Sequence, residues 1–184
     1  MTILPLITPS NKIMKKILLI FLAVFVGLIV IIFSFATLEK TSEVQSYYNI
    51  PDSLREQVRL YTQGMESVQI AKKCVELTAD LLKFSRQEDL NNHQANCVGY
   101  AKICASLCNY AFRVNHINAS AKHVRGYVSC LGVNLCSIAA ALCPESMANF
   151  VKDHDFVEIQ TEGRSIYIDP SIYDLTGRMM LRVR

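Results

Sequence analysis

The sequence has no tryptophan and little proline or glycine. Its 184 residues include 5 prolines and 7 glycines, while 51% of the residues are hydrophobic and 19% are charged. Disordered chains and fibrous repeats contain more proline, glycine or charge and fewer apolar side chains, so this composition excludes both classes. The length suits one domain of ordinary size, or a smaller domain with an anchor.

An excess of charge is also absent from most of the chain. The formal net charge is +3, and three of the 19 basic residues, Lys12, Lys15 and Lys16, lie in the first 38 residues, which contain no acidic residue. The rest of the chain therefore has 16 basic and 16 acidic side chains. A neutral domain offers no electrostatic surface to a phosphate backbone, so we expect no nucleic-acid partner.

A long uncharged run follows these lysines. Residues 17–38 contain no charged side chain and are rich in Ile, Leu, Val and Phe. A helix of this length is roughly 33 Å long, which is enough to cross a bilayer. The positive-inside rule then predicts a single-pass membrane protein, with a cytoplasmic N-terminus (residues 1–16) and residues 39–184 in the periplasm or outside the cell. A cleaved signal peptide, with Ser34 and Ala36 at the cleavage site, is the alternative.

The sequence after this run predicts a tether and then a domain that begins with helices. Residues 39–50 are polar and predict the tether, and residues 51–184 predict the domain. The first helix is expected to open at Ser53, which has capping-box spacing to Glu56. Apolar residues at helical spacing predict a second helix along residues 70–84.

A third helix and a sheet are predicted further along the chain. Residues 97–113 have a helical pattern, and Asn96 is placed as the N-cap. The spacing then changes to that of strands, and residues 160–163 predict a hairpin turn between the last two. The expected strands include residues 124–128, 156–159 and 166–168. Helices followed by an antiparallel sheet predict an α+β fold, here preceded by one transmembrane helix.

Three side chains that could form a catalytic site lie at the ends of the predicted helix and strands. Cys97 starts a helix, where free backbone N–H groups favour a thiolate. His154 opens a strand and could move a proton to or from the thiol, and Asp169 closes the next strand and could orient the imidazole. An antiparallel pairing about the turn at residues 160–163 would bring His154 and Asp169 side by side.

These segments, in this order, resemble the transglutaminase-like superfamily, a branch of the papain-like cysteine enzymes. The matching stretches are Cys97 with Gly99-Tyr100-Ala101, then Val124-Arg125-Gly126, His154-x-Phe156-x-Glu158 and Asp169-Pro170, all within residues 65–175. The resemblance implies a papain-like fold with helices packed on a small antiparallel sheet. It also implies Cys97 as the nucleophile, His154 as the base and acid, and Asp169 as the residue that orients the imidazole.

The chain departs from the family pattern at several positions. Ala95 stands where the family commonly has glycine, and Phe156 where it more often has tryptophan. The chain also lacks the upstream tryptophan that helps to form the oxyanion hole in some relatives. The Cys97 N–H can supply one oxyanion donor. Three polar side chains before the helix are candidates for the second donor: Asn91, Asn92 and Gln94.

Six further cysteines accompany Cys97. Cys104 and Cys108 share its helix face and are expected to pack in the core. One disulfide could form among Cys130, Cys136 and Cys143. The cysteine spacings match no common zinc pattern, so we expect no metal site and no cofactor.

Other residues near the motifs have structural interpretations. Glu158 either supports the site or is a solvent-facing charge, and His93, His116 and His123 are expected to be structural or exposed. The apolar segment 129–151 lies between the first strand and the strand of His154, and either packs as extra core or covers the site as a lid.

The sequence therefore predicts an exported, membrane-anchored thiol enzyme. It would act on amide or peptide bonds of a protein or peptide substrate, through a thioester on Cys97, with water or an amine as the acceptor. The N-terminal helix would provide the contact with the membrane. The alternative is a catalytically inactive module of the same fold that binds a protein or a cell-envelope component.

Overall fold

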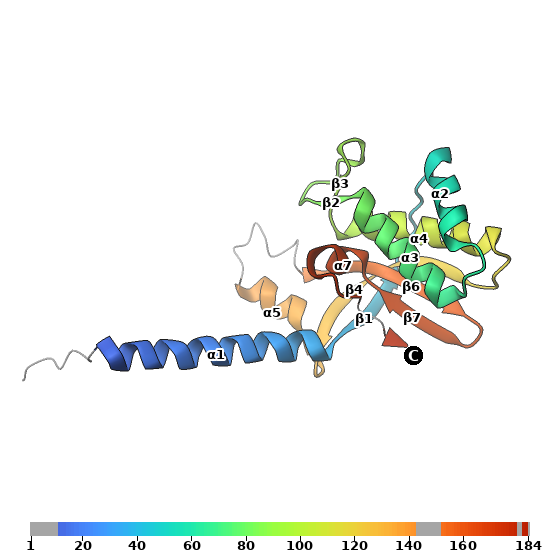
Figure 1. Cartoon of the computed structure of the whole chain (residues 1–184). Coiled ribbons are helices and arrows are strands. Elements are labelled where there is room, and N and C mark those ends of the chain that lie inside the picture. The colour runs from blue at the N-terminus through green and yellow to red at the C-terminus, as the bar shows by residue number, and fades with distance from the viewer. Residues whose placement is uncertain (1–10, 143–151, 180–181, 184) are drawn as a thin grey trace, which may run out of the picture. The chain divides into compact units, whose positions relative to one another are not determined.

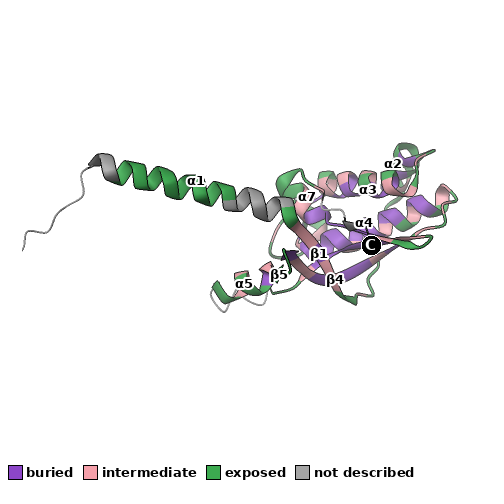
Figure 2. Cartoon of the chain, turned by 90° about the horizontal axis from the view of Figure 1, so that it is seen from below, coloured by how far each residue is buried: buried purple, intermediate pink, exposed green. Residues whose placement is uncertain are grey.

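The computed structural model describes residues 11–142, 152–179 and 182–183, and the chain divides into two compact units. The first unit is Met1–Ala36 and contains helix α1 (Asn11–Phe35). The second unit is Thr37–Arg184 and holds the remaining helices and the sheet. In α1, the side chains of residues 14–27 are exposed (Figure 2).

The prediction of a single-pass membrane protein is wrong. A helix that crosses about 30 Å of hydrocarbon needs roughly 20 predominantly apolar residues in succession. No helix in the described part of the chain is both long enough and apolar enough to meet this requirement. This finding does not fit the predicted transmembrane helix at residues 17–38, nor the single-pass arrangement predicted from it, with a cytoplasmic N-terminus and a periplasmic or extracellular domain.

The second unit is built on a curled antiparallel sheet (Figure 1). Its strands follow the order β1-β4-β6-β7-β8, and the short strand β5 pairs with β4. The strands are β1 (Ala36–Glu43), β4 (Ser120–Cys130), β5 (Val133–Asn134), β6 (His154–Thr161), β7 (Arg164–Ile168) and β8 (Arg182–Val183). A separate small sheet pairs β2 (Lys83–Phe84) with β3 (Gln94–Ala95).

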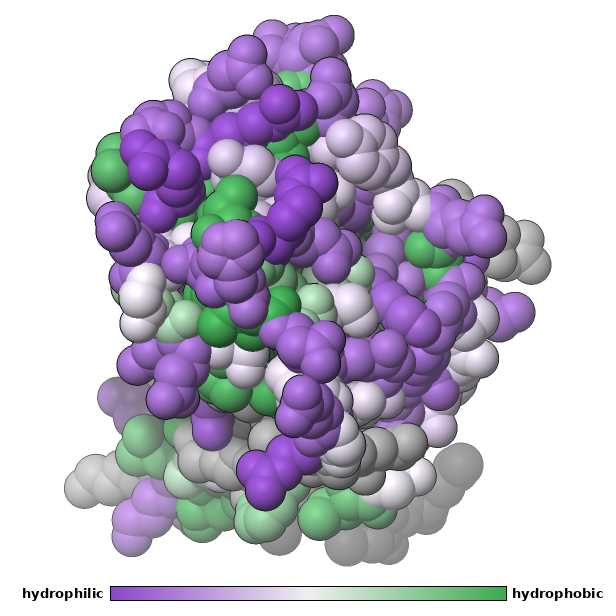
Figure 3. Space-filling model, turned by 90° about the vertical axis from the view of Figure 1, so that its right-hand side faces the viewer, coloured by the Kyte–Doolittle hydropathy of each residue, from purple (hydrophilic) through white to green (hydrophobic). Residues whose placement is uncertain are grey.

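The helices of this unit precede, interrupt and follow the sheet strands. They are α2 (Asp52–Thr62), α3 (Ser67–Leu81), the short 3-10 helix η1 (Leu90–Asn92), α4 (Cys97–Val114), α5 (Leu135–Leu142) and α7 (Pro170–Thr176). Helices α2 to α4 come first and the main antiparallel pairs follow, which confirms the predicted α+β arrangement. The face shown in Figure 3 is mainly hydrophilic with smaller apolar patches.

Helix caps account for two differences and one agreement with the sequence prediction. Helix α2 begins at Asp52 with Pro51 as an N-cap that has no side-chain bond, so Ser53 lies inside the first turn and forms no capping box. A capping box occurs instead at α3, between Glu66 and Gln69. The predicted N-cap Asn96 is confirmed.

The sheet separates two groups of buried side chains. On one face, α4 packs against β6, whose Val157 and Ile159 belong to the same buried cluster, and α3 packs on α4. On the other face Phe156 packs with Leu38 of β1 and Tyr167 of β7. Alternate residues of β6 therefore point to opposite sides, and full burial of each such side chain contributes about 1.5–3 kcal/mol.

Strand β1 occupies part of the segment that the sequence predicts as a tether. A close approach between β1 and β4 requires glycine at position 126, because a Cβ there would lie 1.9 Å from the Glu39 carbonyl oxygen. Residues 39–43 thus belong to the sheet. They join the second unit, which starts at Thr37.

The cysteines of the helices lie in the core, as predicted for Cys104 and Cys108. Both are fully buried, together with Cys74 of α3. Burial and hydrogen bonds to the other two thiols raise the pKa of Cys108 well above its usual value. Cys130 and Cys136 are free thiols, and Cys143 lies outside the described residues.

The apolar segment 129–151 is described only up to residue 142. Helix α5 packs on β4 through Cys136, which is buried. Several apolar side chains around it are at least 45% exposed: Leu131, Val133, Ile138 and Leu142. This part of the segment therefore adds little to the core, and its role as a lid stays a prediction.

Candidate functional site

Cys97 is the first residue of α4 and lies just after strand β3. The Asn96 side chain accepts hydrogen bonds from the N–H groups of Val98 (3.1 Å) and Gly99 (3.3 Å), which fixes the start of the helix. The first turn of a helix carries backbone N–H groups without intrahelical partners and a positive dipole end. Cys97 itself is buried, with 8% of the residue exposed.

His154 is the first residue of β6 and pairs in the sheet with Gly126 of β4. Its Nε2 is hydrogen-bonded to Oδ2 of Asp169. An ionised carboxylate can only accept, so Nε2 carries the proton in this bond. The ring also stacks on Phe156 with centroids 6.4 Å apart, so the aromatic residue of the motif supports the imidazole.

Asp169 follows β7 and is the N-cap of α7. The residue is fully buried, and its second oxygen, Oδ1, accepts bonds from the Ser171 N–H (3.0 Å), the Ser171 hydroxyl (2.8 Å) and the Ile172 N–H (3.0 Å). Burial raises the pKa of Asp169, but the charge of His154 and these hydrogen bonds outweigh it and lower the pKa below its usual value. Both carboxylate oxygens are thus fixed, and the group is ionised near neutral pH.

The His154 ring is hydrogen-bonded to Asp169, and the Cys97 side chain also interacts with it. Burial lowers the pKa of His154, but the charge and hydrogen bond of Asp169, and then the hydrogen bond and charge of Cys97, raise it well above the usual value. Because Nε2 is taken by Asp169, Nδ1 is the ring nitrogen available to the sulfur. An imidazole in this position could exchange a proton with the thiol through Nδ1.

The register of the hairpin differs from the symmetric pairing that the sequence predicts. Strand β6 pairs Val157 with Ile168. Asp169 therefore follows a residue opposite Val157 and is not directly across from His154. The two side chains still meet, because the imidazole and the carboxylate both extend along the sheet across the offset between the two residues.

Tyr100 and Asp174 form a contact beside the site that the sequence does not reveal. The Tyr100 hydroxyl donates a 2.6 Å hydrogen bond to Asp174 Oδ2. Tyr100 lies one turn after Cys97 on α4, and Asp174 lies on α7, which Asp169 caps. Burial and Asp174 raise the pKa of Tyr100 above its usual value, so the hydroxyl stays protonated and donates. The glycine-tyrosine-alanine motif is the one sequence signal for this contact, and it names only Tyr100.

Gly99 and Ala95 are matched to each other. A Cβ at Gly99 would lie 2.7 Å from the Cβ of Ala95. Ala95 stands where the resembling family commonly has glycine, and here the missing side chain at Gly99 makes room for it. The first turn of α4 therefore stays close to β3, which holds Cys97 in place.

Candidates for a second oxyanion donor differ in how they are held. The Asn92 side-chain amide donates a 2.7 Å hydrogen bond to Asp89, so this amide points toward the 3-10 helix η1. Asn91 and Gln94 are exposed side chains in the same segment. The backbone N–H of Cys97 lies in the first turn of α4, where N–H groups have no intrahelical partner, so it stays a candidate donor as well.

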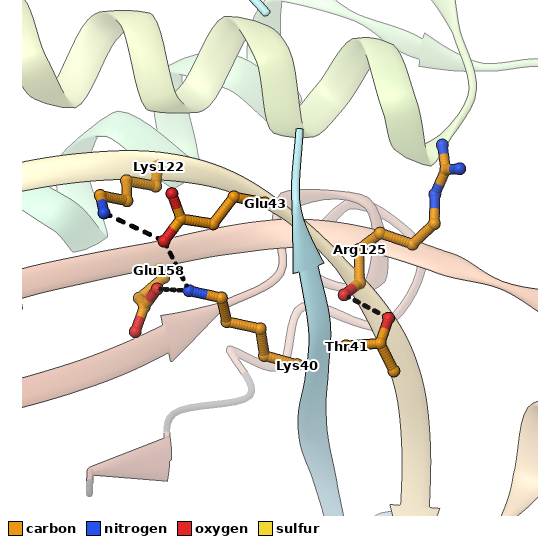
Figure 4. Close-up of polar contacts among 6 residues, drawn as sticks. All are labelled: Lys40, Thr41, Glu43, Lys122, Arg125 and Glu158. Atoms are coloured by element: carbon orange, nitrogen blue, oxygen red, sulfur yellow. Dashed lines mark hydrogen bonds and ion pairs between the residues drawn. The ribbon is translucent and has the colours of Figure 1, made fainter. Parts of the chain in front are cut away.

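Glu158 is not part of the site. It is 3% exposed and pairs with Lys40 of β1 at 2.6 Å, while Lys40 also contacts Glu43 at 2.9 Å (Figure 4). Burial raises the pKa of Glu158, but Lys40 lowers it below the usual value. Neither expectation from the sequence holds, because this carboxylate neither faces solvent nor supports the imidazole, and it ties β6 to β1.

The other histidines and the acidic residues provide no metal centre in the described part of the chain. No group of three or more His, Cys, Asp or Glu side chains there is arranged to hold a metal ion. His93 and His116 are exposed, whereas His123 is buried.

No model of a known protein family, no curated protein and no solved structure matches this chain.

Proposed function

We propose that residues 37–184 form a transglutaminase-like domain with a papain-like arrangement, and that it acts on amide bonds of a protein or peptide substrate. The observation that carries the proposal is that one imidazole, His154, interacts both with the buried Asp169 carboxylate and with the Cys97 side chain. A thiol at a helix start, a base beside it and a fixed acid behind the base are the parts that acyl transfer requires.

The reaction would begin with attack of the Cys97 thiolate on the carbonyl carbon of the amide. The Cys97 N–H stabilises the oxyanion, and protonated His154 gives its Nδ1 proton to the departing amine. A thioester on Cys97 and a free amine result. Asp169 stays ionised and keeps Nε2 protonated throughout, so Nδ1 is the nitrogen that exchanges the proton.

The second step releases the acyl group. His154 Nδ1 removes a proton from the acceptor, which attacks the thioester carbon, and Cys97 leaves as the thiolate. Water gives hydrolysis, and a primary amine gives a new amide bond. Hydrolysis is the outcome that we propose, because water is always present whereas an amine acceptor needs a binding cleft of its own.

Replacement of Cys97 tests this proposal. Fluorescently labelled casein and dansylcadaverine serve as the general amide substrate and the amine acceptor. Cys97→Ala should abolish release of labelled peptides, whereas Cys136→Ser, at a second cysteine that is also 8% exposed, should keep it. Equal activity of the Cys97→Ala variant and the unmodified chain would overturn the proposal.

A non-catalytic binding module of the same fold is the second candidate. The observation that favours it is the small exposure of Cys97, 8%, in a chain without the tryptophan that some relatives use at the oxyanion hole. A folded protein whose Cys97 forms no thioester with any peptide ester tested, but which retains a peptide on a column in both the native and Cys97→Ala forms, would favour this candidate.

A further inference from the structure

A second chain of nucleophile, base and acid lies apart from Cys97. The Ser46 hydroxyl is 2.7 Å from Nδ1 of His123, and Nε2 of His123 is 2.9 Å from Oδ1 of Asp155. Ser46 belongs to the extended segment after β1, whereas His123 lies on β4 and Asp155 on β6. Residues far apart in the sequence are thus joined in one hydrogen-bonded line.

The acid end of this line is buried and charged. His123 and Asp155 are each 3% exposed. Burial raises the pKa of Asp155, but the hydrogen bond to His123 and the nearby Arg125 guanidinium lower it below the usual value. An ionised Asp155 can only accept, so Nε2 of His123 donates to it, and Nδ1 is the ring nitrogen that faces the Ser46 hydroxyl. The hydrogen-bonded line can therefore pass the serine proton to Nδ1.

The serine end of the line opens on a cavity. Ser46 and His123 line a cavity of about 650 Å³, large enough for a small organic ligand. Helix α4 contributes Asn109, Tyr110 and Arg113 to its wall. None of the residues that line it is Cys97, His154 or Asp169, so this is a different place in the fold.

Positive charge exceeds negative charge around this cavity. Arg55, Arg113 and Lys122 line it, with Glu43 as the single carboxylate. Lys122 pairs with Glu43 at 3.0 Å, and Arg55 pairs with Asp52 at 3.2 Å. Arg113 stacks on the Tyr110 ring, 5.5 Å from its centroid, and has no carboxylate partner among the described residues. A ligand with one negative charge would match this guanidinium.

We propose that Ser46, His123 and Asp155 form a second nucleophilic site, which hydrolyses esters of small organic acids that carry a negative charge. Three observations support the assignment: the unbroken line from hydroxyl to carboxylate, the burial of its base and acid, and the cavity at its nucleophile. If Ser46 only held the segment after β1 to the sheet, its hydrogen bond to His123 would be enough, and a cavity beside the hydroxyl would not be needed.

The ester would be cleaved in two steps, through an acyl-enzyme on Ser46. The Ser46 Oγ forms a bond to the ester carbonyl carbon while His123 Nδ1 takes the hydroxyl proton. The carbon–alkoxide bond breaks, and His123 returns the proton to the departing alkoxide, which leaves as an alcohol. Water then attacks the acyl carbon while His123 Nδ1 takes its proton, the bond from this carbon to Ser46 Oγ breaks, and His123 returns the proton to Oγ as the acid is released. An ester suits the site better than an amide because its carbonyl carbon is more electrophilic and an alkoxide is a better leaving group than an amide anion.

The test uses the full chain with Cys97→Ala, so that the first site is silent. A fluorophosphonate probe should label the peptide that contains Ser46, and labelling should be lost in Ser46→Ala and in His123→Gln. Hydrolysis of 4-nitrophenyl hemisuccinate should fall at least about tenfold in both variants, because positioned general-base catalysis contributes about 10²–10⁴-fold. Ser42→Ala, at an exposed serine of β1, should change neither readout.

Charge selectivity gives a second readout. Arg113→Gln should raise the KM for the hemisuccinate ester about fivefold or more, which corresponds to the loss of about 1 kcal/mol from one charged contact. The KM for the uncharged ester 4-nitrophenyl butyrate should stay unchanged. Absence of fluorophosphonate on Ser46, or hydrolysis within twofold of the parent in a folded Ser46→Ala variant, would overturn the proposal. Because Cys97 is absent from this background, failure here leaves the proposed amide chemistry unaffected.

Discussion

The Tyr100 hydroxyl donates a 2.6 Å hydrogen bond to Asp174, and this bond joins the helix of Cys97 to the helix that Asp169 caps. Tyr100 is fully buried one turn after the cysteine. The contact therefore helps to fix the positions of Cys97 and Asp169 relative to each other, although Tyr100 and Asp174 are not among the reacting groups.

Removal of the Tyr100 hydroxyl should distinguish its effect on the position of the nucleophile from its effect on the stability of the fold. We expect Tyr100→Phe to lower the free energy of unfolding by about 1 kcal/mol, because Asp174 is exposed and can bind water in place of the phenol. The turnover number should fall about tenfold, with KM little changed, since a small displacement of the nucleophile affects the chemical step most. Tyr61→Phe, at a half-exposed tyrosine, is the matched control. A variant with full activity would show that the bond is only structural.

The His154–Asp169 pair should make stability depend on pH in a defined direction. The folded pKa of His154 lies well above its unfolded value, about 6.5. Its contribution is therefore fully present below about pH 6.5 and is lost as the pH rises through the folded pKa. The Asp169 pKa is lowered, so the contribution of Asp169 is present above its unfolded pKa, about 3.9, and is lost as the pH falls through the folded pKa.

These two directions define a window between about pH 4 and 6.5 in which both contributions are present. The stability difference between the unmodified chain and His154→Gln should be largest there and should shrink toward pH 9. Urea unfolding of both proteins at pH 5.5, 7 and 9 measures this difference. A difference that grows with pH would contradict the assignment of the ion pair.

Gly126 should tolerate no side chain. A Cβ there would lie 1.9 Å from the Glu39 carbonyl oxygen, so Gly126→Ala must push β1 away from β4. We expect a loss of about 1–3 kcal/mol in the free energy of unfolding, and faster amide hydrogen exchange along β1. Gly27→Ala in α1, where nothing lies within 4 Å of the added Cβ, is the control. Equal exchange along β1 in Gly126→Ala and the unmodified chain would count against this pairing.

The Lys40–Glu158 pair should matter for stability and not for chemistry. Glu158→Gln leaves the Lys40 ammonium without its buried partner and should cost about 1–3 kcal/mol, discounted because Lys40 is partly exposed (Figure 4). Glu43→Gln, at an exposed carboxylate of the same network, should cost much less. Amide cleavage by the Glu158→Gln variant at a temperature where it is folded should equal that of the parent. A large loss of turnover would place Glu158 in the site.

Local capping signals explain what the sequence predicts well. Asn96 satisfies the first N–H groups of α4 with its own side chain, so the start of this helix, and with it the position of Cys97, depends on neighbouring residues alone. The turn before Arg164 likewise produces the β6–β7 hairpin that carries His154 and Asp169 to one end of the sheet.

Tertiary contacts explain what the sequence does not predict. The place of β1 in the sheet depends on the missing side chain of Gly126, and the Tyr100–Asp174 bond joins residues 74 positions apart. Ser53 has the spacing of a capping box, but Pro51 is already extended and the helix starts one residue too early to use it. Hydropathy along residues 17–38 predicts a membrane span that the described helices do not provide.

The alkylation rate of Cys97 tests the central claim most directly. Iodoacetamide should modify Cys97 at pH 6 at least about tenfold faster than Cys136, because a protonated His154 beside the sulfur favours the reactive thiolate. His154→Gln should abolish this advantage while the protein stays folded. Equal rates at Cys97 and Cys136 in the unmodified chain, or an unchanged Cys97 rate in His154→Gln, would contradict the account.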